Sequence, residues 1–173
     1  QVAINLISQV DKGAYSNIAL NETFKTLDIN SKEKAFITEI FYGVLRNKKF
    51  LDYIIERYTK EIKKEWIRNL LRISIYQITF MDSDDKGVVW EATELAKKKY
   101  GMFISKFING TLRNYLRNKD TELKRLDDEK NYEVLYSIPK WFYDILEKQY
   151  GDKNLKQAIT SLKKVPYLSV RIN

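Results

Sequence analysis

The sequence contains neither cysteine nor histidine. Without cysteine there are no disulfides, thiolate metal ligands or cysteine nucleophiles. Without histidine there is no imidazole to act as general base, proton shuttle or zinc ligand. These 173 residues therefore cannot form the active site of an enzyme that depends on cysteine or histidine. We expect them to contain no catalytic residue and no metal site.

Proline and glycine are also scarce, with two and six copies in 173 residues. Long stretches therefore lack helix breakers, which favours helices over a β-sandwich with many tight turns. The dispersed glycines form neither of the common phosphate-binding loops, so we expect no bound cofactor here. No run of about 18 apolar residues is present, and the N-terminal residues lack the features of a secretory signal. We expect an all-α, cytoplasmic monomer that does not bind a membrane.

The excess of basic residues is concentrated in one part of the chain. In total, 31 Lys and Arg stand against 23 Asp and Glu, a formal charge of +8. Residues 86–125 contain ten basic and four acidic side chains and so carry +6 of this excess. A cation excess of this kind commonly binds a polyanion, although basic residues also simply keep a helical surface solvated.

Apolar periodicity predicts about seven helices in residues 1–118. Asn30, three residues before Glu33, has the spacing of a capping box at a helix start. The longest expected helix begins at Ile62 and continues to Met81, and the last of the group extends from about Met102 to Arg117.

Residues 119–136 are rich in charge and poor in periodic apolar positions, which indicates a linker. Beyond it, residues 137–173 are expected to begin a small second subdomain, with two helices separated at Gly151. Residues 165–172 alternate like a β-strand. Because a lone strand cannot satisfy its edges, we expect the rest of its sheet outside these 173 residues.

The basic residues of the last bundle helix are expected to form one stripe. At 100° per residue, Lys106, Arg113 and Arg117 fall within a sector of roughly 40°. The apolar positions of this helix lie on the opposite side, so the stripe should face outward. An outward-facing row of cations suits contacts with RNA phosphates, which supply affinity without reading sequence.

Further candidate RNA-binding residues lie in two short clusters. The three consecutive lysines Lys97, Lys98 and Lys99 precede a turn at Gly101 that could bring them close to the stripe. Arg46, Lys48 and Lys49 stand at a helix end, where a cation also interacts favourably with the helix dipole.

Other residues allow two interpretations. Tyr42, Tyr100 and Tyr115 could stack on RNA bases, but packing is favoured for Tyr42 and Tyr115. Three neighbouring carboxylates could bind a metal, but in a turn they more often cap helices; these are Asp82, Asp84 and Asp85.

Four ordered segments resemble elements of NusB-like domains, in the form that these domains take at the front of ribosomal RNA methyltransferases. The segments are residues 41–46 (FYGVLR), 70–77 (LLRISIYQ), 91–97 (EATELAK) and 107–113 (FINGTLR). Further residues resemble the segment that follows this domain in the bacterial small-subunit rRNA methyltransferase B family: Ser137, Pro139, Trp141, Tyr150, Gly151, Pro166, Arg171, Ile172 and Asn173. Trp90 departs from the pattern, because a polar residue is usual before Glu91, and Thr93 stands where valine is usual.

The resemblance implies a NusB-like bundle that binds 16S rRNA for a methyltransferase domain further along the same chain. That family uses S-adenosylmethionine to make 5-methylcytosine, with two cysteines that have no counterpart here. It also implies that an arginine-bearing start precedes Gln1. Gly110 of the fourth segment is interpreted as a close helix crossing, whereas the role of Asn109 stays open. The alternative function is an antitermination factor of the NusB type, which acts through RNA and a ribosomal-protein partner.

Overall fold

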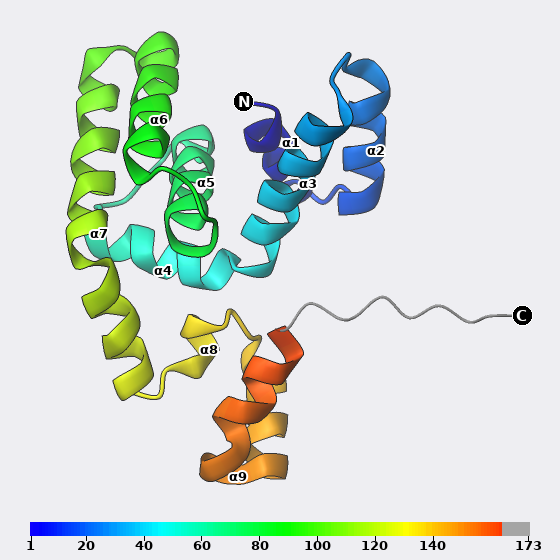
Figure 1. The fold of residues 1–173 in the computed structure, drawn as a ribbon, viewed down its shortest axis with the longest axis vertical. Coiled ribbons are helices and arrows are strands. Elements are labelled where there is room, and N and C mark those ends of the chain that lie inside the picture. The colour runs from blue at the N-terminus through cyan, green and yellow to red at the C-terminus, as the bar shows by residue number, and fades with distance from the viewer. Residues whose placement is uncertain (164–173) are drawn as a thin grey trace, which may run out of the picture.

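The computed structural model describes residues 1–163, which are almost entirely helical (Figure 1). The elements are α1 (Val2–Asp11), α2 (Ser16–Thr26), α3 (Ser31–Arg46), α4 (Lys48–Tyr58), α5 (Glu65–Phe80), α6 (Asp85–Tyr100), α7 (Met102–Asp128), α8 (Tyr132–Leu135) and α9 (Lys140–Lys163). The expected all-α bundle is confirmed. The expected strand at 165–172 lies outside the described residues. Within the described part of the chain, no helix is long and apolar enough to cross a membrane.

Helix α5 is the centre of the bundle and contacts α1, α3, α4, α6 and α7. Its wide apolar face explains this position, because Leu71 and Ile75 are fully enclosed. The helix begins at Glu65 rather than at Ile62, since the backbone at Lys64 is extended. The sequence predicts this helix to be the longest, and that prediction is wrong, because α7 is longer.

Helix α3 begins and packs as its sequence predicts. The Asn30 side chain accepts a hydrogen bond from the Glu33 N–H at 3.0 Å, and the Glu33 carboxylate accepts one from the Asn30 N–H at 2.9 Å. This capping box confirms the predicted start. Near the other end, a Cβ at Gly43 would lie only 2.0 Å from Cζ of Tyr76, so only glycine lets α3 and α5 approach this closely.

The predicted linker at 119–136 is wrong for most of its length. Helix α7 continues without a break to Asp128, and α8 follows after a short turn. Two side chains of the extension are buried, Glu122 and Leu126, and Glu122 accepts hydrogen bonds from Arg57 and Tyr58 of α4. Contacts with α4 therefore stabilise this segment as a helix, although its charge-rich sequence is typical of a linker.

Helices α8 and α9 enclose a small core of their own, and Gly151 breaks α9 with φ 62° where the sequence predicts a helix end. This unit is tied to the bundle. The Phe50 N–H donates a hydrogen bond to Oγ of Ser137 at 2.9 Å, and so an amide at the start of α4 is capped by a residue 87 positions later in the chain. Lys156 pairs with Asp127 at 2.6 Å.

Candidate nucleic-acid interface

Helices α6 and α7 form an antiparallel pair joined at Gly101, whose φ of 83° favours glycine (Figure 1). Oγ of Ser105 donates a hydrogen bond to the Thr93 carbonyl at 3.0 Å, which ties the two helices together just after the turn. Residues 86–125, which lie within this pair, carry +6 of the formal charge of +8.

The predicted stripe of α7 faces outward. Lys106, Arg113 and Arg117 are exposed, whereas Ile108 and Leu112 of the same helix are fully enclosed. The three cations span about 16 Å at 1.5 Å per residue. Because α7 is longer than predicted, the exposed Lys124 extends the same row by two further turns. Within residues 1–163, neither Arg113 nor Arg117 forms an ion pair.

A groove between α6 and α7 brings an aromatic ring beside this stripe. Its lining combines three cations, one indole, two aliphatic side chains and two small polar ones: Lys86, Arg113, Arg117, Trp90, Val89, Leu116, Thr93 and Asn109. Trp90 is 66% exposed although it is among the largest apolar side chains of the chain. Asn109, which the sequence left open, thus has a place in the groove.

The consecutive lysines of α6 do not act as one cluster. Helical spacing places Lys97 on the same side of α6 as Trp90, at two turns' distance, and Lys99 on the opposite side. Nζ of Lys99 lies 4.8 Å from the centre of the Trp66 ring, so this lysine packs on the bundle. Lys97 is 3.8 Å from Glu94 and stays largely exposed. Lys98 is exposed as well.

Arg46, Lys48 and Lys49 lie at the corner between α3 and α4, beside α8, and not along the α6–α7 pair (Figure 1). Nζ of Lys48 is 2.5 Å from a carboxylate oxygen of Asp11, and Lys49 pairs with Glu133 of α8. Both lysines thus have partners within the protein. The structure therefore does not join these residues to the stripe in one surface.

The tyrosines considered for base stacking are packed against other rings. Tyr115 is fully enclosed; burial raises its pKa far above the ordinary value of 10.0, while a hydrogen bond with Thr79 acts in the opposite direction. The ring centre of Tyr42 lies 5.1 Å from that of Phe41. Tyr100 packs edge-on against Trp66 at 5.4 Å. The aromatic residue that does face the cations is Trp90. Its position on α6, nearly opposite the apolar Val88 and Ala92 that the structure buries, is the sequence signal that could have identified it.

The acidic cluster after α5 serves the start of α6. The Asp84 carboxylate accepts hydrogen bonds from the N–H groups of Lys86 at 3.2 Å and Gly87 at 3.1 Å. This is a helix cap, as the sequence favoured. Among the described residues, no group of three acidic side chains is placed to hold a metal ion.

Gly110 does not mark a close helix crossing, contrary to the sequence interpretation. A Cβ at this position would have no atom within 4 Å, because the residue faces solvent in the middle of the stripe. The close approach in this fold is at Gly43 instead.

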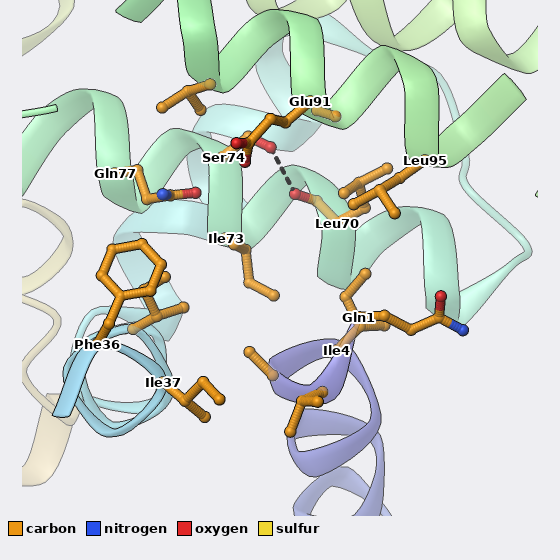
Figure 2. A pocket seen from close by; sticks show the side chains of 15 residues that line it. Gln1, Ile4, Phe36, Ile37, Leu70, Ile73, Ser74, Gln77, Glu91 and Leu95 are labelled. Atoms are coloured by element: carbon orange, nitrogen blue, oxygen red, sulfur yellow. Dashed lines mark hydrogen bonds between the residues drawn. The ribbon is translucent and has the colours of Figure 1, made fainter. Parts of the chain in front are cut away.

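A second pocket lies between α1, α3, α5 and α6 (Figure 2). Figure 2 shows Phe36, Ile37, Ile73 and Leu95 around an apolar space. The hydroxyl of Ser74 is not available to a ligand, because it donates to the Leu70 carbonyl at 2.9 Å. The charged side chain of the lining is the anionic Glu91, so this pocket does not suit a phosphate.

Comparison with known proteins identifies the family to which this fold belongs. The model of the NusB family matches residues 1–117. This chain belongs to the NusB family. The NusB match covers α1 to α6 and the first part of α7, which contains the groove and most of the stripe.

Two curated relatives extend beyond this domain. The chain is 30% identical over 150 residues to a protein named probable ribosomal RNA small subunit methyltransferase B from Bacillus subtilis (strain 168), a match covering 84% of this chain and 34% of that protein. It is 27% identical over 179 residues to the protein of the same name from Synechocystis sp. (strain ATCC 27184 / PCC 6803 / Kazusa), covering 100% of this chain and 40% of that protein. The chain thus spans well under half the length of these relatives.

A third relative matches a shorter part of the chain. The transcription antitermination protein NusB of Dictyoglomus thermophilum (strain ATCC 35947 / DSM 3960 / H-6-12) is 38% identical over 106 residues, which cover 58% of this chain and 73% of that protein.

Proposed function

We propose that this chain is an RNA-binding module that positions 16S rRNA for a cytosine-C5 methyltransferase domain of the same protein, outside residues 1–173. In this proposal the S-adenosylmethionine and the reacting groups belong to that other domain. The observation that carries it is the row of exposed cations on α7, of which Arg113 and Arg117 have no ion-pair partner within residues 1–163.

Exposed arginines without an ion pair suit a polyanion. Each guanidinium presents several N–H donors in a plane and can bind phosphate oxygens in bidentate fashion. A protein that replaces the counterions of RNA in this way gains affinity that depends on salt and little on sequence. The RNA site therefore consists of Lys106, Arg113, Arg117 and Lys124 of α7, with Lys86 and Lys97 of α6. Lys48 and Lys49 are not included because they pair with acidic residues away from the α6–α7 face, and Lys99 is not included because it lies over the Trp66 ring on the other side of α6.

The residues beyond the NusB domain favour the methyltransferase over an antitermination factor. The Bacillus subtilis match covers 150 residues, more than the 117 of the family match, and the Synechocystis match covers the whole chain. The Dictyoglomus NusB match covers 58% of the chain. We propose that residues 137–173 begin the subdomain preceding the catalytic one, and the hydrogen bond between Ser137 and α4 ties the start of this segment to the bundle.

Two measurements test this proposal. The chain alone, incubated with labelled S-adenosylmethionine and 16S rRNA, should transfer no methyl group, because it has no cysteine nucleophile. Filter binding should show that it binds a 16S rRNA fragment without a protein partner, with affinity that falls steeply as salt rises. Affinity that is independent of salt would overturn the electrostatic account, and binding that appears only with a ribosomal protein would establish the antitermination alternative.

A further inference from the structure

Trp90 is an exposed aromatic residue that lines a groove of the protein. Its side chain forms no hydrogen bond, ring contact or cation–π contact within the described part of the chain. It is 66% exposed, and a single exposed apolar residue would be unremarkable by itself. Trp90, however, borders a groove whose apolar lining is completed by Val89 and Leu116. The groove therefore offers a flat ring and an apolar surface to a ligand.

Cations border the same groove on both helices. Lys86 precedes Trp90 by one helical turn, and Arg113 and Arg117 face it from α7. A ligand that fills this groove must pair a flat apolar part with anionic groups close to it. A nucleotide has this combination, since its base stacks on aromatic rings and its phosphates pair with arginine. The amide of Asn109 in the same lining can both donate and accept a hydrogen bond at a base edge.

The cationic row decides between a free nucleotide and a polynucleotide. Lys106 and Lys124 continue the row beyond both ends of the groove, and together the cations span about 27 Å at 1.5 Å per residue. A mononucleotide would leave these outer charges without a partner. A strand with several phosphates would use them.

We propose that Trp90 is a stacking platform for one unpaired base of an RNA strand whose phosphates lie on Arg113 and Arg117. This inference rests on the proposed function and adds a preference for single-stranded RNA. In an A-form duplex the faces of the bases are covered by their neighbours, whereas an unpaired base can present its face to the indole. The phosphate contacts serve both forms of RNA, and the Trp90 contact serves only the unpaired one.

The chain provides a matched control for this platform. Trp141 of α9 is also 66% exposed, and Trp66 is buried. The test compares the 173-residue protein with its Trp90→Ala, Trp90→Phe and Trp141→Ala variants. The two probes are an oligoadenylate and a blunt RNA duplex with the same number of phosphates, each measured over a series of salt concentrations.

Trp90→Ala should weaken binding of the oligoadenylate by about tenfold, with the same salt dependence as the parent protein, because stacking and not charge is lost. Its affinity for the duplex should stay unchanged. Trp90→Phe should retain most of the affinity, and Trp141→Ala all of it. In a Trp141→Phe background, oligoadenylate should quench the emission of the remaining exposed indole.

Equal losses for oligoadenylate and duplex would overturn the stacking role, and so would no loss for either. A change in self-association of Trp90→Ala without a change in RNA affinity would assign the groove to a protein contact and equally overturn it. These outcomes leave the phosphate contacts intact and so differ from failure of the proposed function, in which the parent protein would bind neither RNA in a salt-dependent way.

Discussion

The guanidinium of Arg72 binds the carboxylate of Asp52 through two hydrogen bonds, at 2.7 and 2.8 Å, in the interior of the bundle. The same side chain reaches Asp11 of α1 at 2.9 Å and is only 5% exposed. Burial opposes its charged form, but the bonds to both carboxylates outweigh burial and raise the pKa of Arg72 above its ordinary value. Arg72 thus joins α1, α4 and α5 at one point.

We expect Arg72→Ala to lower the free energy of unfolding by about 2–3 kcal/mol, because it removes the charged hydrogen bonds that link three helices and leaves the buried Asn69 amide oxygen without this donor. Urea denaturation measures this loss. Arg68→Ala is the control, since Arg68 is 3.7 Å from Asp52 and more exposed, and it should cost less than about 1 kcal/mol. Equal losses in the two variants would show that Arg72 does not hold the three helices together.

Two glycines should respond in opposite directions to the same substitution. Gly43→Ala should destabilise the protein by about 1–3 kcal/mol or more, because the new Cβ would meet the Tyr76 ring at 2.0 Å. Gly110→Ala should stabilise it by about 0.5–1 kcal/mol, because its Cβ would meet no atom within 4 Å and alanine favours the helix. Thermal unfolding of both variants distinguishes them, and a destabilising Gly110→Ala would restore the helix-crossing interpretation.

Glu122 should make part of the stability dependent on pH. Burial alone would raise the pKa of Glu122, but hydrogen bonds from Arg125, Arg57 and Tyr58 lower it below its ordinary value of 4.5. Its contribution is therefore complete above 4.5 and is lost as the pH falls through the lower, folded-state value. The stability difference between the parent protein and Glu122→Gln should accordingly shrink in acid.

Urea denaturation at neutral and acidic pH measures this difference, and the exposed Glu61→Gln variant gives the background pH dependence. A difference that stays constant, or that grows as the pH falls, would show that the carboxylate of Glu122 is not stabilised in the folded protein.

Periodicity predicted the parts of the fold that depend on local sequence. The capping box at Asn30 and the outward direction of Arg113 follow from spacing alone, and both are present. The extension of α7 could not be predicted in this way. Leu123 and Leu126 are the apolar positions among many charges there, and Glu122 is held by partners more than sixty residues earlier in the chain. Local polarity therefore indicated a linker where tertiary contacts hold a helix.

In the candidate site, too, local sequence predicted some features and tertiary contacts determine the others. The direction of the stripe depends on one helix, and the sequence was sufficient to place it. Whether a given cation is available depends on its neighbours, and no local pattern shows that Lys48 pairs with Asp11 or Lys49 with Glu133. Trp90 is part of the groove only because α7 folds back along α6, and the sequence alone showed it only as a departure from the polar residue usual at that position.

The most direct test of the RNA-binding face is reversal of its two unpaired arginines. In Arg113→Glu with Arg117→Glu, stability should change by no more than about 0.5 kcal/mol per site, since both residues are exposed. The control reverses Lys148 and Lys153, two exposed lysines of α9, and so changes the net charge equally. Binding to a 16S rRNA fragment over a salt series should show a large loss of affinity for the arginine variant, with a salt slope lower by about two units, and a small loss for the control. Equal losses in the two variants would mean that RNA responds only to overall charge, and the assignment of the α6–α7 face would be wrong.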